Sequence, residues 1–294
     1  MRICPACGRY FESRSWRCPG CGCEPAEKGG FPILSPGAGG EETPFNEESF
    51  ALLAAVEEKN FWFRSRNALI AWALRKFFSG AEKFFEIGCG TGYVLSGVEK
   101  AFPNLDLYGS ELVCSGLSFA SSRLRKAELF QMDARKVPFL EEFDVIGAFD
   151  VLEHVREDEE VLRQMFRAAK KGGGILLTVP QHPFLWSRAD EHGGHFRRYR
   201  LSGLRKKVEA AGFRVFFQTS FVTIPFPLML LSRLMKKKNA GDYDPMEELR
   251  TGGMLNVLLE KSLGMERTLI RCGLRLPYGG SILLAARKDA GSSS

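Results

Sequence analysis

The stretch "KFFEIGCGTGYVLSGVEKAF", residues 83–102, combines three local patterns in succession. Residues 83–87 suit a short apolar strand, residues 88–92 alternate glycine with other residues, and a helical pattern follows them. Glycine lets a backbone approach a ligand closely, and the amide groups at a helix N-terminus favour an anionic group. The stretch therefore predicts a strand, a ligand-binding loop and a helix.

The spacing in this loop is E-x-G-x-G-x-G, formed by Glu86, Gly88, Gly90 and Gly92. It differs from the G-x-G-x-x-G spacing typical of dinucleotide-binding loops. It also lacks the Lys-Ser/Thr ending of a phosphate-binding P-loop. An acidic residue at the last strand position before the glycines suits a cationic ligand group better than a pyrophosphate.

Strand and helix patterns alternate on both sides of this unit. Further strands are predicted near 106–110, 144–149, 174–179, 213–219 and 281–287, one more precedes Asp133, and helices lie between them, such as 157–170 and 202–211. Such alternation is typical of parallel sheets with helices on both faces. We therefore predict an α/β fold with a Rossmann-like, mostly parallel sheet of seven strands flanked by helices.

Two acidic residues follow the second and third predicted strands. Glu111 closes the strand "LDLYGSE", where a carboxylate can bind both hydroxyls of a ribose. Asp133, in "LFQMDARKVPF", can accept a hydrogen bond from an adenine amino group. Either acid alone fits an ordinary loop or helix-cap carboxylate, but their order after the glycine loop favours nucleoside binding.

Taken together, these motifs resemble the class I S-adenosylmethionine-dependent methyltransferase family over roughly residues 48–288. "FFEIGCGTG" is similar to its first motif, "GSE" to its ribose-binding acid and "MDA" to its adenine contact. "FDVIGAFDVLEHV" is similar to its fourth strand and "KKGGGILLTVP" to its fifth. Two positions depart from the common pattern, because Glu86 replaces Asp and "KGGG" replaces "KPGG", and neither change argues against cofactor binding.

The resemblance implies that S-adenosylmethionine is the cofactor. It places Gly88 and Gly90 beneath the methionine part, Glu86 at its ammonium group, and Phe149 and Asp150 at the same end. The implied cofactor-binding set is Glu86, Gly88, Cys89, Gly90, Gly92, Glu111, Leu112, Asp133, Ala134, Phe149 and Asp150.

Catalytic candidates follow strand four in "DVLEHVRED". The cofactor is an activated methyl donor, so the protein must align the acceptor and, for an O or N acceptor, accept a proton. Asp150, Glu153 and His154 are spaced to share one face of a helix start, and His154 is a candidate general base. Alternatively, Glu153 and His154 only cap and orient the loop. A similar cluster in some quinone-biosynthesis O-methyltransferases is associated with a divalent cation, which we do not predict here.

A second group of candidates follows strand five. His192 and His195 are further general-base candidates, and Trp186, Asp190, Arg197 and Tyr199 are candidates for substrate binding. The segments "FWFRSR" (61–66) and "GHFRRY" (194–199) resemble those of one bacterial branch of the family. That resemblance implies the reaction type and leaves the acceptor open.

The basic cluster beyond this segment is predicted to be a helix surface. Ser202 is the expected N-cap, Leu204, Val208 and Ala211 the buried stripe, and Gly212 the stop. Arg205, Lys206 and Lys207 then form the solvated face, so the cluster does not require a phosphate ligand.

The N-terminal cysteines Cys4, Cys7, Cys18 and Cys21 form C-x2-C-x10-C-x2-C, which predicts a structural zinc ribbon over residues 1–24. Such a small segment depends on its metal for folding, and four protein ligands leave no open position for catalysis. Its role stays open among docking a partner, contacting RNA and bracing the fold. Residues 25–45 are predicted to be a linker and 46–290 the methyltransferase domain.

The residues between strand six and the last strand, 221–280, are predicted to form a helical insertion. It is expected to cap the substrate cleft, and an apolar segment followed by Lys236, Lys237 and Lys238 also fits a membrane surface. A lipid-linked or aromatic acceptor suits either version. The apolar run 221–232 is too short to span a bilayer, and the N-terminus lacks a secretory pattern, so we expect a cytoplasmic protein.

The predicted function is methyl transfer to a small-molecule or lipid-like acceptor, by in-line attack of an O or N atom on the sulfonium methyl group. The alternative is an rRNA or tRNA methyltransferase that uses the ribbon to contact RNA. The net charge of +6 is modest for that class, and the sequence after strand four is "DVLE" rather than the N/D-P-P-Y/F signature of base methylation. A non-enzymatic scaffold is disfavoured because the motifs are intact.

Overall fold

The computed structural model describes residues 1–13, 15–38, 45–236 and 252–291, with the backbone alone for 232–236. Its main sheet has seven strands in the order β10-β11-β9-β8-β5-β6-β7. The strands are β5 (Lys83–Ile87), β6 (Asp106–Glu111), β7 (Glu128–Gln131), β8 (Phe143–Phe149), β9 (Ala169–Pro180), β10 (Arg214–Phe221) and β11 (Ser281–Arg287). Only β11 runs antiparallel to its neighbours, β9 and β10. The predicted fold class is confirmed.

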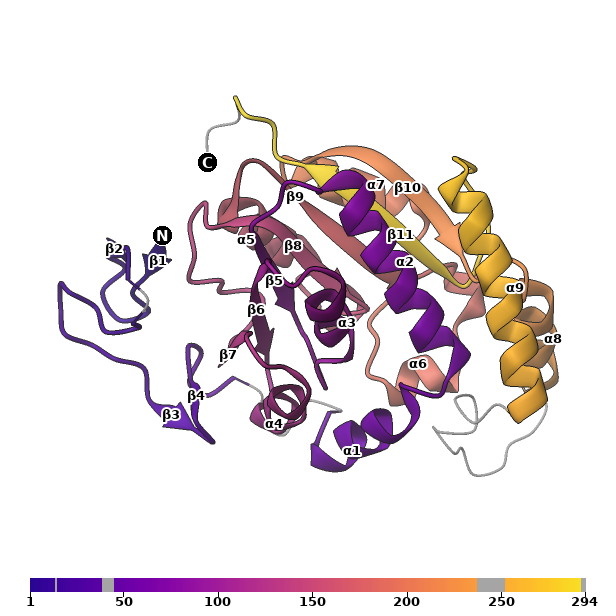
Figure 1. Ribbon diagram of the computed structural model, residues 1–294, viewed down its shortest axis with the longest axis horizontal. Helices are drawn as coiled ribbons and strands as arrows, with labels where there is room; N and C mark the ends of the chain where they lie inside the picture. Colours follow the sequence, from indigo (N-terminus) through magenta and orange to yellow (C-terminus); the bar gives the residue numbers. More distant parts are fainter. Residues whose placement is uncertain (14, 39–44, 237–251, 292–294) are drawn as a thin grey trace.

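Helices cover both faces of this sheet (Figure 1). The first five are α1 (Glu47–Val56), α2 (Phe61–Phe77), α3 (Tyr93–Ala101), α4 (Cys114–Arg123) and α5 (Asp158–Ala168). They are followed by α6 (Arg188–His192), α7 (Leu201–Ala210), α8 (Phe226–Lys236) and α9 (Gly253–Arg271). One core cluster joins α5 and α7 to the sheet, and a second joins α2, α3, α4 and α9 to its other face. The parallel strands β5, β6, β7, β8 and β9 therefore end along one sheet edge, where ligands of such folds bind.

Helix α7 differs from the prediction at its start. It begins at Leu201 with Arg200 in the N-cap position, so Ser202 is not the cap. Leu204 and Val208 of the predicted buried stripe are fully buried, whereas Ala211 is the C-cap residue and only partly buried. Gly212 follows the helix with a φ of 105°, a left-handed conformation that favours glycine at a helix end.

The late insertion consists of α8 and α9. Helix α9 packs beside α2 and β10, and Asn256 fixes it there. The Oδ1 atom of Asn256 accepts a bond from the Phe61 amide at 2.9 Å, and its Nδ2 donates to the Lys59 carbonyl at 2.9 Å. Lys237 and Lys238 lie outside the described residues, and the cap over a cleft stays a prediction. Among the described residues, no helix has the length and apolarity needed to cross a membrane.

The N-terminal part contains two short antiparallel pairs. Strands β1 (Arg2–Ile3) and β2 (Tyr10–Phe11) flank the first cysteine pair. Strands β3 (Glu27–Lys28) and β4 (Phe31–Pro32) form a hairpin inside the segment predicted as a linker. Both pairs lie on the β7 side of the main sheet (Figure 1).

Candidate functional site

The glycine loop after β5 requires its glycines for two reasons. Gly88, Gly90 and Gly92 have φ values of 68°, 52° and 75°, which L-residues with side chains rarely adopt. A Cβ atom at Gly88 would lie 2.6 Å from Val151, and one at Gly92 would lie 2.8 Å from the Ala120 backbone. The loop is therefore a narrow cradle whose backbone forms the surface offered to a ligand.

Glu111 joins this loop to the end of β6. Its Oε2 atom accepts a hydrogen bond from the Gly90 amide at 2.9 Å, and its Oε1 from the Leu112 amide at 2.7 Å. Burial raises the pKa of Glu111, although these amide bonds act in the opposite direction. The carboxylate thus has a fixed position beside the cradle, as a ribose-binding acid requires.

Glu86 is buried beside the glycine loop and is 2% exposed. Its Oε2 atom has no hydrogen-bond partner among the described residues. Burial raises the pKa of Glu86 well above its ordinary value, and the positive charge of Arg66 only partly opposes this. A buried carboxylate without a donor is unfavourable, so a cationic ligand group bound here would compensate for its desolvation.

Asp133 lies after β7, at the side predicted to hold adenine. Its carboxylate accepts bonds from Arg135, from Nη2 at 2.8 Å and from Nε at 3.0 Å. Burial alone would raise the pKa of Asp133, but the bonds from Arg135 hold it below its ordinary value. An adenine amino group would therefore share this carboxylate with Arg135, a residue that the sequence analysis did not single out.

An open groove of about 1210 Å³ adjoins this side of the site. Its lining includes Leu112 and Val113 after β6, Gln131 at the end of β7, and Ser35 from the N-terminal segment. The amide nitrogen of Asp133 donates to Ser35 Oγ at 3.1 Å. Ser35, from the segment predicted as a linker, thus lies at the side of the site that is predicted to bind the nucleoside.

At the other end of the site, Asp150 follows β8 with a φ of 57°. Its Oδ2 atom accepts bonds from the Arg66 guanidinium and, at 3.0 Å, from Thr178 Oγ1. The Arg66 guanidinium stacks on the Trp62 ring at 4.3 Å. The segment "FWFRSR" therefore acts through Arg66 and Trp62, which hold the end of strand β8.

Glu153 and His154 belong to a short 3-10 helix, Leu152–His154, so Asp150 lies outside the helix start predicted to carry all three residues. The side chains of Glu153 and His154 lie next to His195. One carboxylate oxygen of Glu153 and one ring nitrogen of each histidine all lie within 4.8 Å of one another. The His154 and His195 rings are T-shaped with centroids 4.6 Å apart. Burial, helped by the nearby His195, lowers the pKa of His154 to about 3, so His154 is neutral at physiological pH.

Asp190 fixes the orientation of His195. Its Oδ1 atom lies 2.8 Å from His195 Nδ1 and accepts a bond from Arg198 Nε at 2.7 Å. Its Oδ2 atom accepts from the Ser187 amide at 2.8 Å, and the side chain is fully buried. Burial alone would raise the pKa of Asp190, but His195 and Arg198 bring it to about 2. The ionised carboxylate therefore favours the tautomer in which Nδ1 donates and Nε2 can accept a proton.

Other predicted residues lie apart from this group. Tyr199 is buried and donates to Asp158 Oδ2 at 2.8 Å, and Arg197 pairs with Asp158 Oδ1 at 2.6 Å. These contacts hold the segment to the start of α5, a structural role that sequence reasoning missed. His192 and Trp186 are exposed on or beside α6, with Trp186 Nε1 donating to Glu191 at 3.2 Å. Roles in proton transfer or acceptor binding for these four stay predictions.

The remaining predicted cofactor residues line the strand ends. Cys89 and Phe149 are buried, while Leu112 and Ala134 are partly exposed directly after Glu111 and Asp133. The amide of Cys89 donates to the Ser110 carbonyl at 2.9 Å, which ties the cradle to β6.

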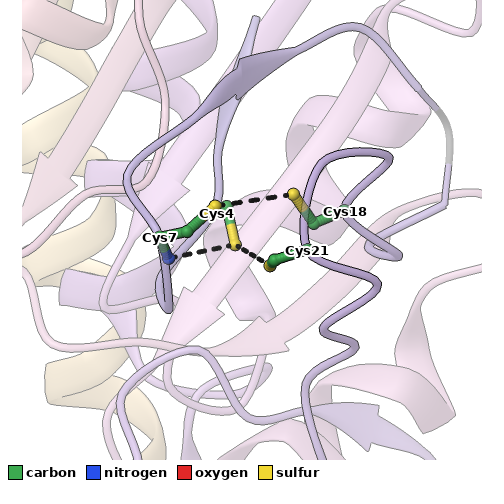
Figure 2. A group of neighbouring side chains, drawn as sticks. All are labelled: Cys4, Cys7, Cys18 and Cys21. Atoms are coloured by element: carbon green, nitrogen blue, oxygen red, sulfur yellow. Dashed lines mark hydrogen bonds between the residues drawn. The ribbon is translucent and has the colours of Figure 1, made fainter.

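The four N-terminal cysteines converge on one point (Figure 2). The sulfur atoms of Cys4 and Cys21 are 3.7 Å apart, and those of Cys7 and Cys18 are 3.8 Å apart. Zinc–sulfur bonds of about 2.3 Å give a regular tetrahedron with edges of about 3.8 Å. The four thiols therefore have the spacing of a structural zinc site.

Comparison with known proteins identifies the family. A methyltransferase-domain family matches residues 58–216, more than half of the chain. The chain belongs to this family. The matched segment contains the glycine cradle, Glu111, Asp133, Asp150 and the Asp190–His195 pair.

Individual relatives share this domain. Phosphatidylethanolamine N-methyltransferase of Cereibacter sphaeroides is 30% identical over 110 residues, which are 33% of this chain and 49% of that protein. Norajmaline N-methyltransferase of Rauvolfia serpentina is 27% identical over 107 residues, covering 34% of this chain and 37% of that protein. The chain thus spans half or less of the length of these curated relatives.

A solved structure shares the fold. Phosphoethanolamine N-methyltransferase 2 of Haemonchus contortus, in complex with S-adenosyl-L-methionine, superposes with a TM-score of 0.56 at 16% identity. The superposition covers 84% of this chain and 58% of that one.

Proposed function

We propose that the protein transfers a methyl group from S-adenosylmethionine to a small-molecule or lipid-like acceptor. The observation that carries this proposal is the buried Glu86 carboxylate, whose Oε2 has no donor among the described residues, beside a glycine cradle bonded to Glu111. The Glu86 carboxylate suits the ammonium group of the amino-acid part of the cofactor, and the Glu111 carboxylate suits its ribose. Membership of the methyltransferase-domain family and the S-adenosyl-L-methionine complex of the Haemonchus protein support the same ligand.

The cofactor supplies an activated methyl group, and the side chains of this protein bind and orient it. Glu86 would accept hydrogen bonds from the ammonium group, the cradle would contact the methionine part, and Glu111 would bind the ribose hydroxyls. Asp133 and the neighbouring Ala134 and Leu112 would contact the adenine. With the adenine at the end of β7 and the ribose at the end of β6, the methionine part of the ligand would lie toward Asp150 and the histidines.

The Asp190–His195 pair is the proposed proton acceptor. An O or N acceptor attacking in line with the methyl group must lose a proton, and His195 Nε2 can take it while Asp190 stabilises the resulting imidazolium. Burial lowers the pKa of His154 to about 3, which keeps its ring neutral beside His195. Among the three predicted base candidates, we favour His195 because its Nδ1 lies 2.8 Å from the buried Asp190 carboxylate.

The proposed acceptor class rests on the exposed faces of α8 and α9. Met254 is 89% exposed, Leu258 63% and Leu228 59%. Such an apolar surface suits a lipid-like acceptor and the peripheral membrane contact that it entails. The names of the Cereibacter and Haemonchus relatives, which act on ethanolamine-containing compounds, are compatible with this class.

The RNA alternative is less well supported. Arg2 and Trp16, an arginine and an aromatic residue of the N-terminal segment, are buried against the methyltransferase domain, whereas Arg9, Tyr10 and Arg17 are exposed. Arg2 donates to Glu128 at 2.7 Å, and Trp16 lies within the main core cluster. We propose that the cysteine cluster holds a structural zinc ion and that its role lies within this chain.

Calorimetry with S-adenosylhomocysteine tests the proposed cofactor site. We expect Glu111→Gln to weaken binding about 10- to 100-fold, because hydrogen bonds to a charged group contribute about 1.5–3 kcal/mol. Glu99→Gln is the matched control, since the Glu99 carboxylate also accepts two backbone amides, from Arg125 at 3.0 Å and Lys126 at 2.9 Å. Equal affinity of wild type and Glu111→Gln would refute the ribose assignment.

A further inference from the structure

The N-terminal cysteine segment is built onto the edge of the main sheet. Arg2 forms an antiparallel bridge with Phe139. The Ile3 amide donates to the Pro138 carbonyl at 2.9 Å, and the Leu140 amide donates to the Met1 carbonyl at 3.0 Å. The first residues of the chain therefore extend the methyltransferase domain beside its edge strand β7.

Trp16 connects the metal site to this edge. It lies between the two cysteine pairs, is 7% exposed, and packs edge-to-face against Phe130 and Phe139 with ring centroids 5.7 and 5.5 Å away. Its Nε1 donates to Glu128 at 3.1 Å, and Arg2 stacks on its ring at 4.2 Å. A metal that orders the loop between the cysteine pairs thus also orders a side chain packed on β7.

The residues after β4 then reach the nucleoside side of the cofactor site. The Leu34 amide donates to the Gln131 carbonyl at 2.9 Å, and the Ser35 amide to Gln131 Oε1 at 3.1 Å. Ser35 Oγ accepts from the Asp133 amide at 3.1 Å. Ser35 therefore fixes the backbone of the residue proposed to contact adenine.

Gln131 extends the same connection to the ribose side. Its Nε2 atom donates to the Leu112 carbonyl at 3.2 Å and to the Ser35 carbonyl at 3.2 Å. Gln131 is 2% exposed and Ser35 7% exposed, so loss of either partner would leave buried polar groups unsatisfied. The Gln131 side chain thereby links the N-terminal segment to the loop after Glu111, and Ser35 links it to the Asp133 backbone.

We propose that the N-terminal segment, residues 1–13 and 15–38, forms a metal-dependent clamp on the nucleoside half of the cofactor site, with Ser35 and Gln131 as positioning residues. Metal binding at the four cysteines and cofactor binding are then coupled, although no ligand atom is shared between the two sites. Thermodynamic linkage makes this coupling reciprocal, so the cofactor stabilises the bound metal by the same factor. This inference rests on the proposed cofactor site.

The first test measures S-adenosylhomocysteine affinity by calorimetry on zinc-loaded protein. Ser35→Ala is expected to weaken binding about 5- to 20-fold, within the usual range of coupling between sites. Ser13→Ala is the matched control, because Ser13 is exposed in the same segment. Cys21→Ser removes one metal ligand at an exposed position and is expected to weaken binding similarly. Wild-type affinity in both Ser35→Ala and Cys21→Ser would overturn the clamp.

The second test follows zinc release to a chromophoric chelator, a readout independent of methyl transfer. Saturating S-adenosylhomocysteine should slow release from wild type at least fivefold and leave release from Ser35→Ala nearly unchanged. Equal release rates with and without the ligand in wild type would overturn the coupling. If wild type binds no S-adenosylhomocysteine at all, the proposed function fails together with this inference, whereas ligand binding without coupling refutes the clamp alone.

Discussion

His195→Gln is expected to lower kcat by about two to four orders of magnitude, the usual contribution of a general base, while leaving S-adenosylhomocysteine affinity unchanged. The physical reason is that the Asp190 carboxylate, 2.8 Å from Nδ1, leaves the second ring nitrogen of His195 as a proton acceptor. Glutamine keeps a polar side chain of similar reach but cannot accept and release the proton at neutral pH.

The measurement is transfer of a radiolabelled methyl group into a lipid and metabolite extract, followed by kinetics on the acceptor that becomes labelled. His192→Gln is the matched control, because His192 is three positions away and exposed. Equal rates for wild type and His195→Gln would exclude His195 as the base. A loss confined to His192→Gln would move that role to His192.

Asp190→Ala is expected to lower the free energy of unfolding by about 3–5 kcal/mol, because it leaves a buried charged partner without compensation. Arg198 loses the carboxylate at 2.7 Å, and the Ser187 amide loses its acceptor at 2.8 Å. Urea unfolding measures the loss, and Glu191→Ala is the control, since Glu191 is adjacent and exposed. A loss below about 1 kcal/mol would show that this network does not stabilise the segment.

The pH dependence of this effect has a definite sign. The pKa of Asp190 is about 2 in the folded protein, below the ordinary value near 3.8, so the folded state favours the ionised form. Its contribution to stability is complete above the unfolded pKa and is lost as pH falls through the folded pKa. The difference between wild type and Asp190→Ala should therefore shrink as pH falls below about 4.

The strands and the acids at their ends could be predicted from the sequence because their signals are local. Strand β5 and the last strand β11 coincide with the predicted ranges, and Glu111 closes β6 as expected. Helix starts were predicted less exactly, since the 3-10 helix Leu152–His154 excludes Asp150 and Arg200 rather than Ser202 precedes α7.

Contacts between distant segments could not be predicted from spacing. Arg66 binds Asp150 across 84 positions, and Ser35 binds the Asp133 backbone across 98. The same limit explains Tyr199, whose hydroxyl is bonded to Asp158 across 41 positions. The cysteine spacing predicted a zinc site, but no local pattern indicated that Trp16, inside the cysteine loop, belongs to the core of the main domain.

The most direct test of the cofactor site is a crystal structure of the protein with S-adenosylhomocysteine. We expect the ribose hydroxyls at the Glu111 carboxylate, the ammonium group at Glu86, and the sulfur atom directed toward Asp150 and His195. A ligand seated elsewhere, or with its ribose remote from Glu111, would contradict the account.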